Sequence, residues 1–141
     1  MGYTHYWDVK KNISKSMFKK TSTECKKLLN AIGNKIKLSS YDEESGKPIF
    51  SDTEICFNGV GGESHEDFYL SQNRTDFKFC KTARKPYDLL VVGCLIVAKV
   101  TMGNRISVRS DGEEVDWQEG IDFVNKTLNL SVKYEDIVTN E

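Results

Sequence analysis

A single apolar segment limits what this chain can fold into more than any other feature. Ten successive residues, Leu89–Ala98, are apolar or glycine. A membrane-spanning helix needs about 20 apolar residues, so this segment predicts a buried element of a folded domain. Its length favours a helix that begins at Pro86, runs to about Thr101 and stops at Gly103. A strand is the alternative, because several of these residues are β-branched.

Two amphipathic helices are predicted on either side of it. The first lies between an N-cap at Ser14 and a C-terminal Gly33, and the last begins at a capping box formed by Asp116 and Glu119. Their apolar residues follow the 3-4 spacing of one buried face. The first stripe consists of Met17, Phe18, Thr21, Cys25, Leu28, Leu29 and Ile32, and the last of Trp117, Ile121, Val124 and Leu128.

Short strands complete the predicted order. Residues 2–8 alternate, with Tyr3, His5 and Trp7 on one side. Further strands are expected at residues 54–58, 67–71, 77–81 and 106–109, with loops at 39–47 and 59–62. The polar tail after Leu130 is expected either to fray or to dock on a partner. The order β-α-β-β-β-α-β-α predicts one α+β domain over residues 1–141, an antiparallel sheet with helices packed mainly on one face.

Charge and composition narrow the possible partners. Twenty basic and 21 acidic side chains give a net charge of −1, which argues against general attraction to nucleic acid or to an anionic membrane. Nine lysines and one acid, Glu24, lie between Lys10 and Lys37. A nucleic-acid-binding helix is one interpretation, but the absence of interleaved arginine or aromatic side chains favours a solvated face.

The residues that usually carry chemistry are scattered. Cys25, Cys56, Cys80 and Cys94 form no CxxC motif, so they are predicted to be reduced, partly buried thiols. His5 and His65 lie far apart, and no GxSxG motif is present. We therefore predict no metal site, no cofactor and no catalytic residue. A small cyclic-nucleotide hydrolase that uses His5 or His65 remains the alternative.

One segment combines cations with aromatic rings. Residues 77–87 hold four cations and three aromatics. Lys81, Arg84 and Lys85 precede the predicted central helix, where free backbone N–H groups and cations together favour an anion. Either Phe79 or Tyr87 can stack on a base. A surface turn with its aromatics in the core is the equal alternative.

Arg109, Ser110 and Asp111 form a second such place, at a strand end. A planar guanidinium there can grip two phosphate oxygens. Pairing of Arg84 or Arg109 with the acids of residues 111–122 is the structural alternative. Arg74, in a polar turn, is expected to contribute little. His5, between Tyr3 and Tyr6, is either a satisfied core histidine or a ligand contact.

Four blocks of sequence resemble a known family. They are Gly2-Tyr-Thr-His-Tyr-Trp7, Cys56-Phe-Asn-Gly59, Phe79-Cys-Lys-Thr-Ala-Arg-Lys-Pro-Tyr-Asp88, and Ser110-Asp-Gly with Asp116-Trp-Gln. Together they resemble the Thoeris anti-defence protein one family of phages and prophages, from Gly2 to about Leu128.

The resemblance implies binding rather than catalysis. Members of that family sequester glycocyclic ADP-ribose, the signal of TIR-domain defence enzymes, without degrading it. They assemble from dimers, and some form hexamers that take cyclic oligonucleotides at separate sites. The setting it implies is the cytoplasm of the infected bacterium; no signal peptide is visible in the sequence. The motif blocks place ligand contacts at Tyr3, His5, Tyr6, Asn58, Phe79, Lys81, Thr82, Arg84, Lys85, Arg109, Ser110 and Asp111.

Overall fold

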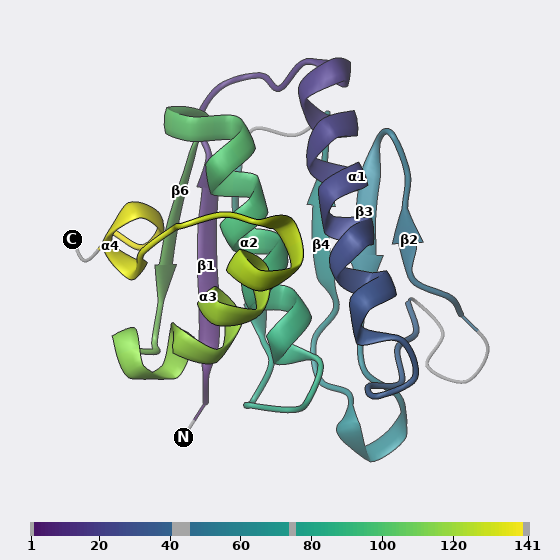
Figure 1. Ribbon diagram of the computed structural model, residues 1–141. Helices are drawn as coiled ribbons and strands as arrows, with labels where there is room; N and C mark the ends of the chain where they lie inside the picture. Colours follow the sequence, from purple (N-terminus) through teal and green to yellow (C-terminus); the bar gives the residue numbers. More distant parts are fainter. Residues whose placement is uncertain (1, 41–45, 74–75, 140–141) are drawn as a thin grey trace.

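The computed structural model describes residues 2–40, 46–73 and 76–139, and within them the chain has an α+β fold (Figure 1). The described strands form two antiparallel three-stranded sheets, ordered β5-β1-β6 and β2-β3-β4. The strands are β1 Thr4–Val9, β2 Ile49–Phe50, β3 Glu54–Phe57, β4 Phe68–Ser71, β5 Phe77–Lys81 and β6 Ile106–Ser110. The helices are α1 Lys15–Ile32, α2 Asp88–Met102, α3 Glu114–Leu128 and the short α4 Tyr134–Ile137.

The two sheets lie side by side and form one layer, with α1, α2 and α3 on the same side of it (Figure 1). The segment before β4 is tied to β5, since the backbone N–H of Glu66 donates to the Lys81 carbonyl and the Lys81 N–H donates to the Glu66 carboxylate. The predicted fold class, with helices on one face of an antiparallel layer, is thereby confirmed.

Strand β1 is the centre of the first sheet. His5 lies opposite Cys80 of β5 and Ser110 of β6, whereas Tyr6 lies opposite Phe79 and Arg109. Because side chains alternate along a strand, the first group points toward the helices and the second away from them. The predicted alternation of residues 2–8 therefore decides which residues share a site.

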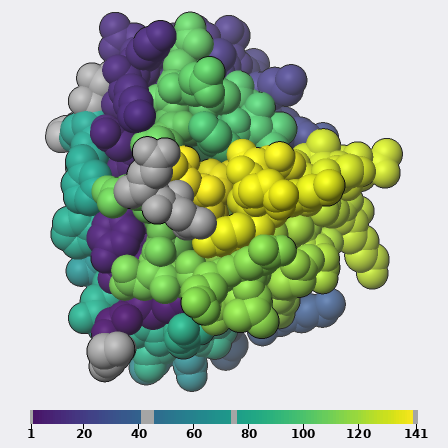
Figure 2. Space-filling view, turned by 90° about the vertical axis from the view of Figure 1, so that its left-hand side faces the viewer, coloured from purple at the N-terminus to yellow at the C-terminus, as the bar shows by residue number. Residues whose placement is uncertain are grey.

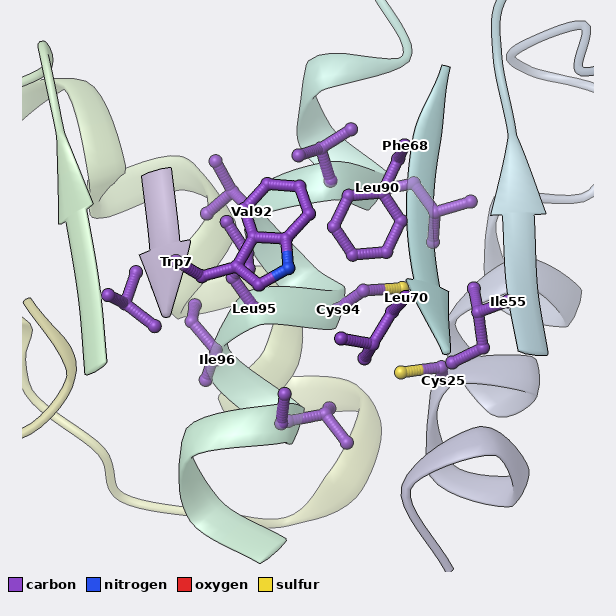
Figure 3. Close-up of a cluster of buried hydrophobic side chains, with 14 of the residues drawn as sticks. Trp7, Cys25, Ile55, Phe68, Leu70, Leu90, Val92, Cys94, Leu95 and Ile96 are labelled. Atoms are coloured by element: carbon purple, nitrogen blue, oxygen red, sulfur yellow. The ribbon is translucent and has the colours of Figure 1, made fainter. Parts of the chain in front are cut away.

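Helix α2 is the buried centre of the molecule, as its sequence predicts. It begins at Asp88, two residues after Pro86, and Gly103 ends it in a left-handed conformation (φ 59°). Figure 3 shows Leu90, Val92, Cys94, Leu95 and Ile96 packed among side chains from both sheets and from α1. The partners drawn there are Trp7 of β1, Ile55 of β3, Phe68 and Leu70 of β4 and Cys25 of α1.

Helix α1 also follows its prediction. The Ser14 hydroxyl accepts a hydrogen bond from the Met17 N–H at 3.1 Å, and Gly33 (φ 57°) ends the helix. Met17 and Leu29 of the predicted stripe are only partly buried. The four cysteines are buried and free.

Other predictions were wrong in detail. Helix α3 begins earlier than expected, because Glu113 and Asp116, rather than Asp116 and Glu119, form its capping box. The sequence also did not predict β2, α4 or the division into two sheets. The polar tail packs on its own chain, since Val138 forms a parallel bridge with Val108 of β6. Part of the loop expected at 39–47 lies outside the described residues. No helix of the described chain is long and apolar enough to cross a membrane.

Candidate functional site

The two faces of β1 carry two different groups of functional side chains. The inner face leads into a hydrogen-bonded network that we call the inner network: His5, Thr82, Asp88 and Ser110. The outer face presents Tyr6, Phe77, Phe79 and Arg109 to solvent, and we call this set the outer surface.

His5 stands at the centre of the inner network and is fully buried (0% exposed). Its Nδ1 lies 2.8 Å from Ser110 Oγ, and its Nε2 lies 2.6 Å from Asp88 Oδ1. The Thr82 hydroxyl donates to the same Asp88 oxygen at 2.6 Å, and the Gly112 N–H donates to Ser110 Oγ at 2.8 Å. A neutral imidazole satisfies both contacts when Nε2–H donates to the carboxylate and Nδ1 accepts from the serine hydroxyl.

Arg84 lies at the edge of the inner network and is already paired. Its Nη1 donates to Asp116 Oδ1 at 3.1 Å, and its Cζ lies 4.0 Å from the centroid of the Tyr3 ring. Ala83 and Arg84 both have left-handed backbone conformations (φ 53° and 60°), which only a few per cent of residues other than glycine adopt. For Arg84, the structure therefore shows the pairing with residues 111–122 that was the structural alternative.

Nearby groups shift two pKa values here. Burial raises the pKa of Tyr3 to about 12, assisted by the charges of Asp88 and Asp116. The backbone N–H of Glu113, followed by Arg84, holds the pKa of Asp116 below its usual value. Tyr3 thus keeps its proton, and Asp116 its negative charge, at neutral pH.

A cavity of about 340 Å³ opens beside Tyr3 and Arg84, but its charges do not suit an anion. It is lined by two cations, Arg84 and Lys85, and three acids, Asp88, Asp116 and Glu119. The first amides of α2 are also occupied: the Asp88 N–H donates to the Lys85 carbonyl at 2.9 Å and the Leu90 N–H to the Tyr87 carbonyl at 3.0 Å. These contacts and charges disfavour the anion site expected at this helix start.

The outer surface is different because its rings and cation face solvent. Phe77 and Phe79 are 49% and 53% exposed. The Phe77 centroid lies 6.2 Å from those of Tyr6 and Phe79, and Arg109 Cζ lies 5.8 Å from the Tyr6 centroid. In Figure 2 the strands of this sheet form the left-hand flank, away from the helices. Two largely exposed phenylalanines side by side are typical of a binding surface.

A hollow of about 270 Å³ lies at one end of the outer surface. Phe77, Arg109 and Lys10 contribute to its lining, as do Asp8 and Ser107. Its cations outnumber its acids, and within the described residues Arg109 forms no ion pair with a carboxylate. Among the described residues, an anion that approaches Arg109 therefore displaces no carboxylate from it.

Of the remaining predicted site residues, Lys81 and Asp111 lie close to β1, whereas Asn58 does not. Lys81 lies on the outer face beside Thr4, and Asp111 accepts hydrogen bonds from the Tyr6 hydroxyl and the Thr4 N–H. Asn58 lies elsewhere, directly after β3, where it forms an isolated bridge with Ser39. It is buried, and its amide bonds to the His65 carbonyl and to Asp67, so its observed contacts hold the 59–65 turn in place.

Sequence reasoning missed Asp88, Phe77 and Lys10 as site residues. The signal for Phe77 was present, because it alternates with Phe79 and Lys81 on one face of a strand. Asp88 had no local signal, since its contact with His5 depends on the packing of α2 against β1.

The described residues contain no cluster of three or more histidine, cysteine or acidic side chains able to hold a metal ion. Comparison with models of known protein families, with curated proteins and with solved structures gave no match.

Proposed function

We propose that this protein binds and sequesters a cyclic ADP-ribose-type nucleotide, of which glycocyclic ADP-ribose is the candidate, and returns it unchanged. The observation that carries the proposal is the outer surface, where Arg109 lies over Tyr6 beside the exposed rings of Phe77 and Phe79. The resemblance of the four sequence blocks to the anti-defence family supplies the identity of the ligand.

The outer surface supports a nucleotide in two ways. A purine can stack on an exposed aromatic ring, which contributes about 1–3 kcal/mol per base. A diphosphate carries about two negative charges at neutral pH and needs fixed cations or backbone donors where it is buried. Arg109 and Lys10 line one hollow next to Phe77, so one ligand can reach both cations and a ring.

The size of the hollow supports a site shared between two chains. At about 270 Å³, it falls below the ~300–1,000 Å³ typical of pockets that enclose a small molecule. A second copy placed over the outer surface would complete the enclosure and cover the exposed phenylalanines. We accordingly propose a homodimer as the binding unit. Larger assemblies, a cyclic-oligonucleotide site and a role in the cytoplasm of a phage-infected bacterium follow from the resemblance alone.

Calorimetric titration with glycocyclic ADP-ribose tests the site. A charged hydrogen bond contributes about 1.5–3 kcal/mol, so Arg109→Ala should weaken binding about 10- to 150-fold. Arg105, exposed just before β6, provides the matched control, because Arg74 lies outside the described residues. Arg105→Ala and Arg84→Ala should change affinity less than twofold. Equal losses in the Arg109 and Arg105 variants would contradict the proposed site.

Recovery of the ligand tests the absence of turnover. After incubation, the protein is denatured by heat and the released material is separated by chromatography. Intact ligand supports sequestration, whereas a new product that increases with protein concentration supports the hydrolase. Steeply salt-dependent binding to any nucleic acid, unchanged by Arg109→Ala, would instead favour the basic helix α1.

A further inference from the structure

The inner network contains a serine, a histidine and an aspartate connected in series. Ser110 Oγ lies 2.8 Å from His5 Nδ1, and Asp88 Oδ1 lies 2.6 Å from His5 Nε2. Ser110 comes from β6, His5 from β1 and Asp88 from the first turn of α2. Asp88 is 83 positions from His5 in sequence, and Ser110 is 105 positions from it. A serine beside a base that is oriented by a third group is the arrangement that activates a nucleophile.

We infer that Ser110 is an activated nucleophile, with His5 as its general base and Asp88 as the group that orients His5, and that it acts on uncharged carboxylic esters. The ring nitrogens have the opposite assignment to that of serine proteases, since Nδ1 rather than Nε2 faces the hydroxyl. The proton transfer is the same, because either nitrogen accepts a proton when the other donates to a carboxylate.

The reaction can be followed atom by atom. The Ser110 oxygen forms a bond to the carbonyl carbon of the ester, and its proton moves to His5 Nδ1. The bond between that carbon and the alkoxide oxygen then breaks, and His5 returns the proton to the departing alcohol. Water later attacks the acyl carbon, and His5 takes a proton from it. The bond between that carbon and the Ser110 oxygen then breaks, His5 returns the proton to Ser110, and the acid leaves.

The surroundings favour a neutral substrate and provide a donor for the oxyanion. Ser110 is half-buried, and its side chain interacts with the phenol of Tyr3, which stays protonated at neutral pH. A protonated phenol can donate to the negative oxygen that develops on an acyl carbon. Ser110 does not itself line the 340 Å³ cavity, but its neighbour Tyr3 and the Asp88 that bonds to His5 both do. The cavity's three acids outnumber its two cations, which disfavours phosphate esters and other anions.

This activity is separate from nucleotide binding, because the two sites lie on opposite faces of one sheet. Tyr6 and Arg109 point away from the helices, whereas His5 and Ser110 point toward them. A nucleotide held on the outer surface lies outside the reach of Ser110, so sequestration without degradation and ester hydrolysis are compatible in one chain.

Covalent labelling of the full chain with phenylmethylsulfonyl fluoride tests the inference, with the modified serines located by peptide mass mapping. The Ser110 oxygen displaces fluoride from sulfur if it is activated. Ser131, which is exposed and lies outside the inner network, is the internal control. A positioned general base contributes about 10²–10⁴-fold, so Ser110 should react at least 100-fold faster than Ser131. A ratio below tenfold in the wild-type protein would overturn the inference.

Variants then separate activation from simple exposure. His5→Gln and Asp88→Asn, checked for folding by thermal melting, should lower the labelling rate of Ser110 by tenfold or more. Wild-type protein should also release nitrophenol from p-nitrophenyl acetate and retain an acetyl group on Ser110. A folded His5→Gln protein that labels at the wild-type rate would count against the assigned roles. If neither variant folds, the ratio of Ser110 to Ser131 in the wild-type chain decides.

Discussion

Residues that are neighbours in β1 point to opposite faces of the sheet, so their side chains differ in burial and in the residues that they contact. Trp7 is almost completely buried against Phe68, with ring centroids 5.0 Å apart, whereas Tyr6 is only half-buried and is close to Phe77 and Arg109. Around Trp7 the inner face is closed, because its side chains contact one another. The outer face is open, because its aromatic rings and its arginine remain exposed to solvent.

This difference separates residues that stabilise the fold from residues available to bind. On the inner face, each group that is removed leaves a void or an unpaired partner, so substitution lowers stability. On the outer surface, the same change removes a contact that only a ligand or a second chain would make. Substitutions on the two faces test this division.

Trp7→Ala and Tyr6→Ala form the sharpest pair, since the two positions are adjacent on one strand. Trp7→Ala should lower the free energy of unfolding by about 3–5 kcal/mol, because it leaves a large void against α2 and β4. Tyr6→Ala should lower it by less than about 1 kcal/mol. Urea denaturation measures both changes, and similar losses would mean that the outer face also has a structural role.

His5→Ala should have the next largest effect on stability. It removes both hydrogen bonds of the imidazole and leaves Ser110 and Asp88 without that partner. The expected loss is about 2–4 kcal/mol, from the unpaired groups and the small void together. Thermal melting gives the size of the loss. A change below about 0.5 kcal/mol would show that the inner network contributes little to folding.

Phe79→Ala should affect binding and leave the fold intact. Because the ring is about half exposed, the free energy of unfolding should stay within about 0.5 kcal/mol of wild type. Affinity for the nucleotide should fall by about 1–3 kcal/mol if a base stacks on this ring. Titration and denaturation of the same preparation separate the two effects. If Phe79→Ala lowered stability and left affinity unchanged, Phe79 would be a structural residue and not a binding residue.

Arg84→Ala should produce the smallest effect, a slight decrease in melting temperature, because exposed ion pairs contribute little. The effect should depend on pH. Since the pKa of Asp116 is below 3.8 in the folded protein, the stabilisation by this carboxylate is present above about pH 4 and is lost as the pH falls further. Melts of both proteins at pH 7 and pH 3 test this. A larger difference at pH 3 would contradict the pairing.

Much of the fold could be predicted from sequence because the relevant signals are local. The 3-4 spacing places α1, and the alternation in residues 2–8 is enough to assign His5 and Tyr6 to opposite faces of a strand. The capping box of α3 was misplaced because two pairs of acidic residues near its start, Glu113 with Asp116 and Asp116 with Glu119, both have the required spacing. Glu113 and Asp116 form the box in the folded chain.

The candidate sites could be predicted only in part, because they depend on register and packing. Nothing in the local sequence of Asp88 indicates that its carboxylate bonds to His5. Arg84, before the predicted central helix, and Arg109, at a strand end, are both candidates from sequence, and only the tertiary structure shows that Arg84 is paired with Asp116. Charge and residue type identified the candidates, whereas the fold separated paired from unpaired cations.

The central position of β1 also has a consequence for how the chain folds during synthesis. The strand leaves the ribosome before both of its partners, residues 77–81 and 106–110. Its sheet therefore cannot close until the chain has been made as far as residue 110. Pairing over such distances slows folding, and until it is complete Trp7 and the apolar residues of α2 stay exposed to other nascent chains. We therefore expect the yield of folded protein to depend on temperature and on chaperones during expression more than its final stability would suggest.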